Sequence, residues 1–424
     1  MRFVYTLVFY LLIPAILLRL LWRSHAAPAY AERWAERFGF FAPLQTNKKV
    51  VWLHTVSVGE FIAALPLIRQ LQLNPALQLV ITTTTPTGSE RVRASLGESV
   101  FHVYAPYDLP DVLARFLYRI KPVVMLVMET ELWPNSIAAC AKRQIPAVLV
   151  NGRMSERSAR GYEKIAALTR PMLQKMRLGL IQNKVDAERL QRLGLAAENI
   201  LVTGNIKFDL QLSDELRLQA AWLKQRWSHH GERLIWIAAS THQGEDEIIL
   251  DALRQLRNNQ QSLKNILLVL VPRHPERFTS VVNLCEKRGL ITARHSSGIF
   301  NETIEVVVGD TMGELLLLLG ASDIAFIGGS LVANGGHNFI EPAAWGLPIL
   351  SGIHIFNFAE VAQLLLDAGG LTLVNAAEDL AEQVQLLAES QVERSHRGLA
   401  ALTVANENRG ALQKTLAAIE PFIQ

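Results

Sequence analysis

The sequence has few cysteines and lacks four common catalytic motifs. Among 424 residues only Cys140 and Cys285 occur, far apart and without CxxC spacing. This arrangement argues against a disulfide framework or a zinc site and fits a reducing compartment. The patterns GxxxxGK(S/T), HExxH, GxSxG and GxGxxG are all absent. Their absence removes the usual P-loop, zincin, hydrolase-elbow and dinucleotide-binding interpretations.

Charge is also scarce, and it is unevenly distributed. Charged residues make up 19% of the chain and hydrophobic residues 50%, a composition typical of a packed globular enzyme. The length allows two or three compact units. The residues before Val50 carry seven Lys or Arg against two Glu, whereas the remaining basic and acidic residues sum to −2. The whole positive excess therefore lies at the front of the chain.

The front of the chain also carries an apolar run of sixteen residues without a charge, residues 3–18. As a helix this run covers about 24 Å, less than the roughly 30 Å hydrocarbon core of a bilayer. We expect residues 1–23 to form a membrane anchor, either a short single span or a deeply seated helix. The alternative is a cleaved secretory signal, because residues 27–29 (APA) resemble a cleavage site. Two arginines between the run and that site, Arg19 and Arg23, disfavour this alternative.

The segment after the anchor, residues 24–49, is basic. The positive-inside rule then predicts a cytoplasmic body. We expect Arg23, His25, Arg33 and Arg37 to lie near anionic lipid head groups of the inner membrane.

From residue 50 onward, short apolar runs alternate with amphipathic ones. Most of the apolar runs are continuous, as in parallel strands that helices cover on both faces. The expected strands are residues 50–54, 79–84, 101–104, 123–128, 147–150, 178–182, 200–203, 234–238, 266–271, 291–293, 305–308, 324–327, 348–350 and 371–374. The pattern restarts at Arg233, after a polar helix expected over residues 214–227, which predicts two similar α/β halves. Ligands of such sheets bind at the carboxyl ends of the strands, and we expect a cleft between the halves.

The pattern gives a set of expected domain boundaries, with the division between the halves near residues 205–232. The two domains are expected at residues 50–210 and 211–400. Residues 401–424 are expected to end in a helix, about 405–419, that packs back on the first half.

Carboxylates interrupt the pattern at two expected strand ends in the first half. Glu60 follows a strand and a turn that contains Gly59, so it lies near a helix N-terminus, where the helix dipole favours its charged form. It is either an ordinary first-turn residue or a base that accepts a proton from a substrate hydroxyl. Glu129 and Glu131 end an apolar strand, where an unpaired buried carboxylate is costly. We expect Glu131 to start a helix and Glu129 to be functional.

Other polar residues follow strands in both halves. Lys207 is either a solvated surface residue or a contact for an anionic substrate. Arg273 follows a proline-terminated strand and offers a planar fork for a phosphate. Thr311 and Glu314 have capping-box spacing, which predicts helix initiation there.

A glycine-rich segment, residues 328–342, is the strongest local signal. Its four glycines allow the backbone to approach a ligand closely. A helix expected to begin near Asn338 presents N–H groups suited to a phosphate, and Glu341 can accept hydrogen bonds from ribose hydroxyls. A glycine loop without a ligand is the alternative.

Taken together, seven segments make the chain resemble bacterial 3-deoxy-D-manno-octulosonic acid (Kdo) transferases, inner-membrane enzymes of lipopolysaccharide core assembly. The resemblance covers nearly the whole chain, the anchor included. The segments are residues 54–60 (HTVSVGE), 82–91 (TTTTPTGSER), 129–135 (ETELWPN), 203–209 (TGNIKFD), 272–278 (PRHPERF), 309–315 (GDTMGEL) and 328–341 (GGSLVANGGHNFIE).

The resemblance implies a GT-B fold, that is, two Rossmann-like domains, with the donor nucleotide in the second and the lipid acceptor at the first. The implied donor is CMP-Kdo and the implied acceptor is lipid IV A, the tetra-acylated disaccharide precursor of lipid A. Matched positions imply that Glu60 is the catalytic base and that Glu129 and Lys207 stabilise the transition state. The matched CMP-binding positions are Pro272, Arg273, Met312, Gly313, Glu314, Asn338, Phe339, Ile340 and Glu341. The family often has Pro where this chain has Phe339.

The implied reaction inverts the anomeric carbon in one displacement, with Glu60 taking the proton of the attacking hydroxyl. Arg273, the amides around Asn338 and a helix dipole are expected to stabilise the departing CMP. Lys207 would offset either the Kdo carboxylate or the departing phosphate. We expect no metal, no cofactor apart from the donor substrate, and no nucleic-acid partner. Two alternatives have the same architecture: a nucleotide-sugar epimerase, which needs no anchor, and a membrane-attached nucleotide sensor, which needs no Glu60.

Overall fold

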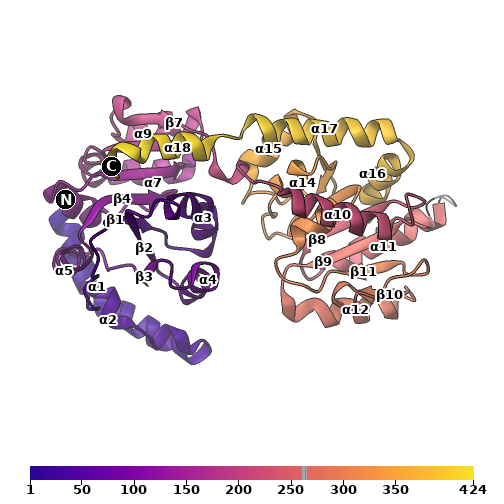
Figure 1. Ribbon diagram of the computed structural model, residues 1–424, viewed down its shortest axis with the longest axis horizontal. Coiled ribbons are helices and arrows are strands. Elements are labelled where there is room, and N and C mark those ends of the chain that lie inside the picture. The colour runs from indigo at the N-terminus through magenta and orange to yellow at the C-terminus, as the bar shows by residue number, and fades with distance from the viewer. Residues whose placement is uncertain (260–262, 264) are drawn as a thin grey trace. The chain divides into compact units, whose positions relative to one another are not determined.

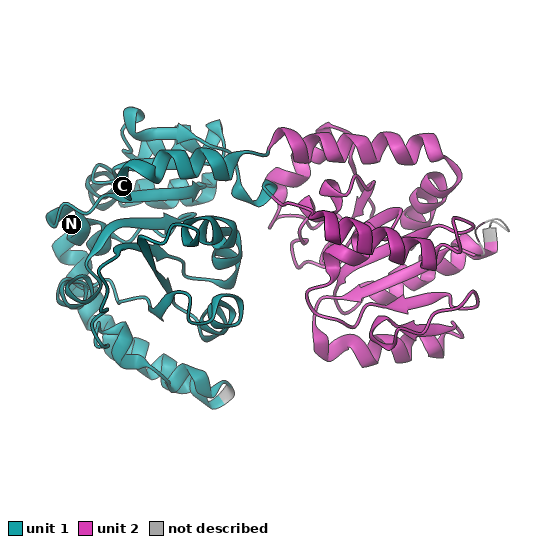
Figure 2. Cartoon of the chain, viewed as in Figure 1, with its two compact units in different colours: residues 1–209, 409–424 teal, residues 210–408 magenta. Residues whose placement is uncertain are grey.

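A computed structural model describes residues 1–259, 263 and 265–424. The chain divides into two compact units, and the last residues of the chain belong to the first (Figure 2). Unit 1 contains Met1–Asp209 and Arg409–Gln424, and unit 2 contains Leu210–Asn408. Each unit has its own parallel sheet with helices on both faces (Figure 1).

Unit 1 is built on a seven-stranded sheet with the order β3-β2-β1-β4-β5-β6-β7, all pairs parallel. Its strands are β1 (Lys49–His54), β2 (Leu77–Thr83), β3 (Phe101–Tyr104), β4 (Pro122–Met128), β5 (Ala147–Gly152), β6 (Leu178–Ile181) and β7 (Ile200–Val202). Its helices are α1 (Arg2–Ala26), α2 (Trp34–Arg37), α3 (Val58–Gln72), α4 (Pro86–Leu96), α5 (Pro110–Ile120), α6 (Pro134–Lys142), α7 (Glu156–Lys164), α8 (Ala166–Leu173), α9 (Lys184–Leu193) and α18 (Ala411–Ile419), with short 3-10 turns η1 (Pro28–Ala31), η2 (Ala197–Asn199), η3 (Ile206–Phe208) and η7 (Glu420–Phe422).

Alternate residues of the central strand face two different hydrophobic cores. Trp52 of β1 packs with Phe116 of α5 on one face of the sheet. Leu53 belongs to the cluster on the other face, together with Phe61 and Leu67 of α3. Because a strand points successive side chains to opposite faces, burial on both sides requires a continuous apolar run.

Unit 2 is built on a second seven-stranded parallel sheet, with the order β10-β11-β9-β8-β12-β13-β14. Its strands are β8 (Ile235–Thr241), β9 (Leu267–Pro272), β10 (Thr292–Arg294), β11 (Val306–Val308), β12 (Ile324–Ile327), β13 (Ile349–Ser351) and β14 (Leu371–Leu373). The helices described in this unit are α10 (Asp214–Trp227), α11 (Glu245–Asn259), α12 (Phe278–Lys287), α13 (Leu315–Gly320), α14 (Ile340–Ala344), α15 (Ala359–Asp367), α16 (Ala377–Glu389) and α17 (Gln391–Glu407), with 3-10 turns η5 (Pro275–Arg277) and η6 (His295–Ser297).

The predicted α/β architecture is confirmed in both sheets. Each expected strand overlaps an observed one, and the largest difference is at the end of β8, which extends to Thr241. The expected helix over residues 214–227 is α10.

The C-terminal segment differs from the single helix expected over residues 405–419. Residues up to Glu407 complete α17 of unit 2, Gly410 adopts a positive φ of 94°, and α18 begins at Ala411. The carboxylate of Asp209 accepts hydrogen bonds from the backbone N–H groups of Gly410 and Leu412, at 2.5 and 2.6 Å. Asp209 therefore caps α18, whose apolar face packs into the core cluster that contains α3.

Helix α1 contains the expected anchor and is part of unit 1 (Figure 1). The hydroxyl of Tyr10 donates to Asp111 of α5 at 2.5 Å, and the amide of Asn135 on α6 donates to the hydroxyl of Thr6 at 2.9 Å. Most large apolar side chains of the helix are exposed, and Phe3 and Trp22 are 79% and 75% exposed. Within the part of the chain that the structure describes, α1 is the one helix long and apolar enough to cross a membrane.

Two arginines of the basic segment 24–49, Arg33 and Arg37, have partners within the protein, although both were expected to lie near lipid head groups. Arg33 forms an ion pair with Glu36 at 2.7 Å. Arg37 is buried, lies over the ring of Tyr104 and donates to the backbone carbonyl of Thr84. Acidic and aromatic partners within unit 1 therefore hold these two charges in place of lipid head groups.

Candidate active site

The carboxyl ends of the unit 1 strands bring together Glu60, Glu129 and Lys207, three residues that are far apart in the sequence. Glu60 follows β1, Glu129 follows β4, and Lys207 lies in η3 after β7. The charges of Glu131 and Glu129 both act on Glu60, and Lys207 contacts Glu129. The structure therefore places the three residues predicted from the first half in one neighbourhood.

Glu60 sits in the first turn of α3, with its side chain fixed by a capping box. The hydroxyl of Ser57 accepts from the backbone N–H of Glu60 at 3.3 Å and donates to its carboxylate at 2.8 Å. The backbone N–H of Val56 donates to the other carboxylate oxygen at 2.8 Å. The helix-start interpretation of Glu60 is thus correct, and it is compatible with a second role.

Burial gives Glu60 an unusually high pKa for a carboxyl group. The residue is 8% exposed, and its pKa is raised from 4.5 to about 7. Burial is the largest cause and the charges of Glu131 and Glu129 add to it, whereas the hydrogen bonds from Val56 and Ser57 lower the pKa. A carboxylate with a pKa near 7 exchanges protons readily at neutral pH, which is the property needed in a general base.

Glu129 stands at the tip of β4 in a backbone conformation that is uncommon for a side chain larger than glycine, with φ of +54°. Its backbone N–H donates to the carbonyl of Val150 on the neighbouring strand at 3.0 Å. The side chain is buried, and its two oxygens are paired with Lys207 at 3.0 Å and Arg153 at 2.9 Å. Two cations therefore compensate the buried charge.

Lys207 is held in place by its own turn. The backbone N–H of Ile206 donates to the side chain of Asn151 at 3.0 Å, and the N–H of Lys207 donates to Asn205 at 3.0 Å. The ammonium is partly exposed while it pairs with Glu129. Lys207 therefore keeps part of its surface in solvent while its charge is paired with Glu129.

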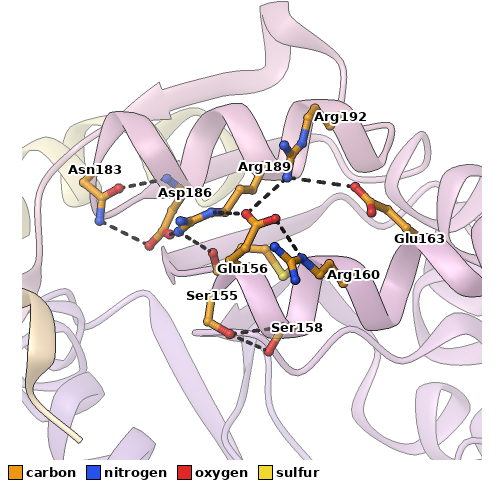
Figure 3. Close-up of polar contacts among 10 residues, drawn as sticks. Ser155, Glu156, Ser158, Arg160, Glu163, Asn183, Asp186, Arg189 and Arg192 are labelled. Atoms are coloured by element: carbon orange, nitrogen blue, oxygen red, sulfur yellow. Dashed lines mark hydrogen bonds and ion pairs between the residues drawn. The ribbon is translucent and has the colours of Figure 1, made fainter. Parts of the chain in front are cut away.

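Arg153 was not predicted as a site residue from the sequence, although it directly follows β5. The loop that carries it is anchored by an ionic network on α7 and α9 (Figure 3). Arg189 pairs with Glu156 and Asp186 and donates to the carbonyl of Met154 at 3.0 Å. This network fixes the residues next to Arg153, so the position of the second cation on Glu129 depends on contacts made in α9.

The expectation that Glu131 begins a helix is wrong. Helix α6 begins at Pro134, and Trp133 occupies the capping position without a side-chain hydrogen bond. The carboxylate of Glu131 accepts from the indole N–H of Trp133 at 2.9 Å. Pro134 explains the later start, because proline suits the first helical position and restricts the residue before it.

In unit 2, the first part of the glycine-rich segment binds a side chain of the protein itself. The carboxylate of Glu245 accepts hydrogen bonds from the backbone N–H groups of Gly329, Ser330 and Leu331, at 2.7 to 2.9 Å, and from that of His242. A Cβ atom on Gly328 would lie 2.8 Å from the carbonyl oxygen of Ser240. In this first part of the segment, the close approach that glycine permits is therefore to other atoms of the protein.

The second part of the segment carries Asn338–Glu341 after two glycines with positive φ, Gly335 and Gly336. Helix α14 begins at Ile340, later than expected, and has five residues. The side chain of Asn338 accepts from the N–H of Ile340 at 3.0 Å, so this amide is already occupied. Phe339 and Ile340 are buried side chains, and only their backbone is suited to a ligand.

Arg273 lies beyond the end of β9, with its backbone N–H bound to the carbonyl of Thr241 at 3.0 Å. Its side chain is exposed and makes no hydrogen bond or ion pair with any described residue. Its charge acts on Glu341: burial raises the pKa of that carboxyl, while the hydrogen bond from Asn338 and the charge of Arg273 lower it. Arg273 thus offers an unpaired guanidinium for an anion.

Three histidines near Arg273 were not predicted as site residues. The rings of His242 and His337 stack with centroids 5.0 Å apart, and their Nε2 atoms lie 2.8 Å apart. His274 meets His242 edge-on at 5.2 Å. Burial and the charges of Arg273, His242 and His274 lower the pKa of His337 to about 4. The segments that carry these residues are visible in the sequence, but their convergence is not.

Met312, Gly313 and Glu314 lie in the loop between β11 and α13. Gly313 has a φ of +89°, and the carboxylate of Glu314 lies 3.2 Å from Nε2 of His295. The capping-box prediction is wrong, because α13 begins at Leu315 without a side-chain cap. Thr311 keeps a buried hydroxyl without a hydrogen-bond partner among the described residues. No group of three or more His, Cys, Asp or Glu residues in this described part of the chain is arranged to hold a metal ion.

Comparisons with known proteins agree with these segments. A model of the family described as "3-Deoxy-D-manno-octulosonic-acid transferase (kdotransferase)" matches residues 32–210. The chain is 45% identical to the 3-deoxy-D-manno-octulosonic acid transferase of Haemophilus influenzae, over 100% of this chain and 99% of the relative. It is 36% identical to the enzyme of the same name from Bordetella pertussis, over 100% and 99%. A glycosyltransferase structure from Rickettsia africae matches with a TM-score of 0.57 at 15% identity, over 89% of this chain and 100% of that one, which supports the GT-B fold alone.

Proposed function

Because this chain belongs to the Kdo transferase family and is therefore a glycosyltransferase, we propose that it moves Kdo from CMP-Kdo to lipid IV A with inversion at the anomeric carbon, using Glu60 as the general base. Family membership argues against the two alternatives, the epimerase and the nucleotide sensor. The observation that carries the proposal is the buried, hydrogen-bonded carboxylate of Glu60, whose pKa is raised to about 7 beside the Glu129–Lys207 ion pair.

In the proposed reaction an acceptor hydroxyl attacks the anomeric carbon of Kdo as Glu60 removes its proton. A new carbon–oxygen bond forms, the bond to the CMP phosphate oxygen breaks, and CMP leaves with the electron pair. The hydrogen bonds from Val56 and Ser57 support this role because they hold the carboxylate oxygens in fixed positions before and after proton transfer.

Glu129 and Lys207 are proposed to stabilise the charges that develop in this displacement. The fixed carboxylate of Glu129 favours positive charge at the anomeric carbon. Lys207 is the partly exposed member of the pair, which supports contact with the Kdo carboxylate or the leaving phosphate.

Unit 2 is proposed to bind the CMP part of the donor through Pro272, Arg273, Met312–Glu314 and Asn338–Glu341. The unpaired guanidinium of Arg273 supports a phosphate contact. Because the N–H of Ile340 is bound to Asn338 and α14 is short, the charge of Arg273 carries more of the stabilisation than the helix dipole. We propose no metal and no cofactor in addition to the donor substrate.

Helix α1 is proposed to attach the enzyme to the cytoplasmic face of the inner membrane, where the lipid acceptor resides. Its exposed apolar side chains support membrane contact. The contacts of Thr6 with Asn135 and of Tyr10 with Asp111 tie the first third of the helix to the body of unit 1. They support a helix seated along the membrane surface, because α5 and α6 of the body then lie beside the apolar run and not across a bilayer from it.

The test is substitution of Glu60 by Gln in the full chain, followed by mass spectrometry of lipid IV A after incubation with CMP-Kdo. We expect the rate of Kdo transfer to fall by about 10² to 10⁴, with CMP binding by calorimetry unchanged. Glu188→Gln is the matched control, because Glu188 is an exposed residue of α9 outside the site. Unchanged turnover in Glu60→Gln would remove Glu60 from the mechanism.

A further inference from the structure

An apolar cavity of about 290 Å³ lies between α1 and α8 in unit 1. Tyr5 and Phe9 of α1 form one wall, and Ile165, Leu168 and Met172 form another. The hydroxyl of Thr169, which also lines the cavity, donates within its own segment to the carbonyl of Tyr162 at 3.0 Å. The cavity therefore presents mainly carbon, as a ligand pocket for an apolar group does.

The wall formed by α1 is fixed by polar contacts on either side of Phe9. The hydroxyl of Thr6 is bound to Asn135, and that of Tyr10 to Asp111. On the helix surface away from these contacts, Leu11 is 71% exposed. The same helix thus lines the cavity and carries the apolar surface that we assign to the membrane, so the cavity adjoins the membrane-facing side of the protein.

The cavity continues along α8. A second cavity of about 330 Å³ shares Pro134, Leu168 and Met172 with the first and extends to Met1 and Lys175. The two cavities share three lining residues, so they lie next to each other beside α8.

The other end of the first cavity reaches the candidate active site through Trp133. This indole ring lines the cavity, donates its N–H to Glu131 at 2.9 Å and meets the ring of His54 edge-on at 5.4 Å. Glu131 in turn acts on Glu60. One aromatic side chain therefore separates the apolar cavity from the carboxylates at the strand ends.

We propose that the cavity between α1 and α8 binds an acyl chain of the acceptor lipid and thereby positions the acceptor sugar at Glu60. This inference rests on the proposed function, which makes the acceptor a lipid. A lipid whose sugar reaches Glu60 has to lift part of its acyl region toward the protein, and the cavity keeps that region out of water. The proposed occupant is the acceptor, because Trp133 in the wall of the cavity contacts Glu131, whose charge acts on Glu60.

The test compares two acceptors in mixed micelles with the full-length enzyme: lipid IV A, and the same disaccharide with all acyl chains removed. Ile165→Asp places a charge in the cavity at a position that is 46% exposed and so tolerates a polar side chain. Leu168→Trp fills the cavity without adding charge. Val185→Asp is the matched control, an exposed aliphatic residue of α9 outside the cavity.

We expect Ile165→Asp and Leu168→Trp to raise KM for lipid IV A by about tenfold, the effect of losing roughly two buried methylene groups. KM for CMP-Kdo and the rate with the deacylated acceptor should match those of the unaltered enzyme and of Val185→Asp. An unchanged KM for lipid IV A in both variants would overturn the inference. An equal loss with the two acceptors would also overturn it, because it would indicate a structural role.

Photo-crosslinking separates this inference from the proposed function. Lipid IV A with a diazirine in one acyl chain should label peptides that contain residues 132–134 or 162–172, with or without CMP-Kdo. Labelling there with no Kdo transfer to either acceptor would support the cavity and reject the function. Labelling confined to the outer surface of α1, or equal labelling by a diazirine phosphatidylethanolamine, would overturn the inference, since the occupant would then be the bilayer.

Discussion

The ammonium of Lys207 lies 3.0 Å from one carboxylate oxygen of Glu129, and the guanidinium of Arg153 lies 2.9 Å from the other. Glu129 is 5% exposed, so its charge depends on these two cations. A buried carboxylate that loses one partner is strongly disfavoured, whereas an exposed ion pair contributes little. The pair therefore constrains both the local structure and the charge that a substrate meets.

Replacing Lys207 by Met should lower kcat for Kdo transfer by about 10² to 10³, the usual effect of removing one fixed group that stabilises a transition state. The affinity for CMP should stay the same, because the proposed CMP contacts all lie in unit 2. Steady-state kinetics and calorimetry with CMP measure the two quantities. Lys184→Met, at an exposed position of α9, is the control. A normal kcat with weakened CMP binding would contradict the assignment of Lys207.

The pH dependence of the enzyme should follow Glu60. Its pKa is raised to about 7 by burial, and a base works only when deprotonated, so kcat/KM should fall tenfold per pH unit below about pH 7. Stability should change in the opposite direction. The folded chain holds this proton more tightly than the unfolded chain, so the stability due to protonated Glu60 is complete below pH 4.5 and is lost as the pH rises through about 7.

Rate profiles and thermal unfolding of the unaltered enzyme and Glu60→Gln between pH 5 and 8 measure both trends. The substitution should remove this part of the pH dependence of stability, because Gln does not titrate. A rate profile in the unaltered enzyme that is flat down to pH 5 would show that Glu60 is not the group whose deprotonation limits the reaction.

Glu131→Gln should shift the acid limb of the rate profile to lower pH. The charge of Glu131 raises the pKa of Glu60, so removing that charge favours the deprotonated base. The side-chain oxygen of Gln can still accept the indole N–H of Trp133, which preserves the turn. Activity at pH 6 relative to pH 8 should therefore increase. Glu163→Gln, on α7, serves as the control, and a shift to higher pH in Glu131→Gln would refute the coupling.

The strands and the residues at their ends could be predicted because the necessary information is local. A parallel strand buried on both faces requires a continuous apolar run, and β4 meets this requirement up to Met128. The first polar residue after such a run must lie at the edge of the sheet, which identifies Glu129. The same reasoning places Arg273 after β9.

Contacts between distant segments could not be predicted in this way. Tyr10 and Asp111 are separated by 101 positions, and nothing in the apolar run of α1 indicates that its hydroxyls face the protein. The glycines of residues 328–336 were expected to let the backbone approach a ligand, whereas the amides of Gly329, Ser330 and Leu331 are bound to Glu245, 84 positions before Gly329. A carboxylate and a phosphate are both suited to a row of backbone N–H groups, so the glycine pattern alone does not distinguish an internal acceptor from a ligand.

Glu245→Ala should therefore loosen the glycine-rich segment of unit 2. The substitution leaves the N–H groups of Gly329, Ser330 and Leu331 without their acceptor in a buried location, and each unsatisfied group costs about 1 to 3 kcal/mol. Hydrogen exchange of the full chain, followed by mass spectrometry, should show at least about 100-fold faster exchange for peptides covering residues 328–332. Glu247→Ala, an exposed position in the same helical turn, should leave these peptides protected. Equal protection in the two variants would mean that the carboxylate of Glu245 is not what holds the segment in place.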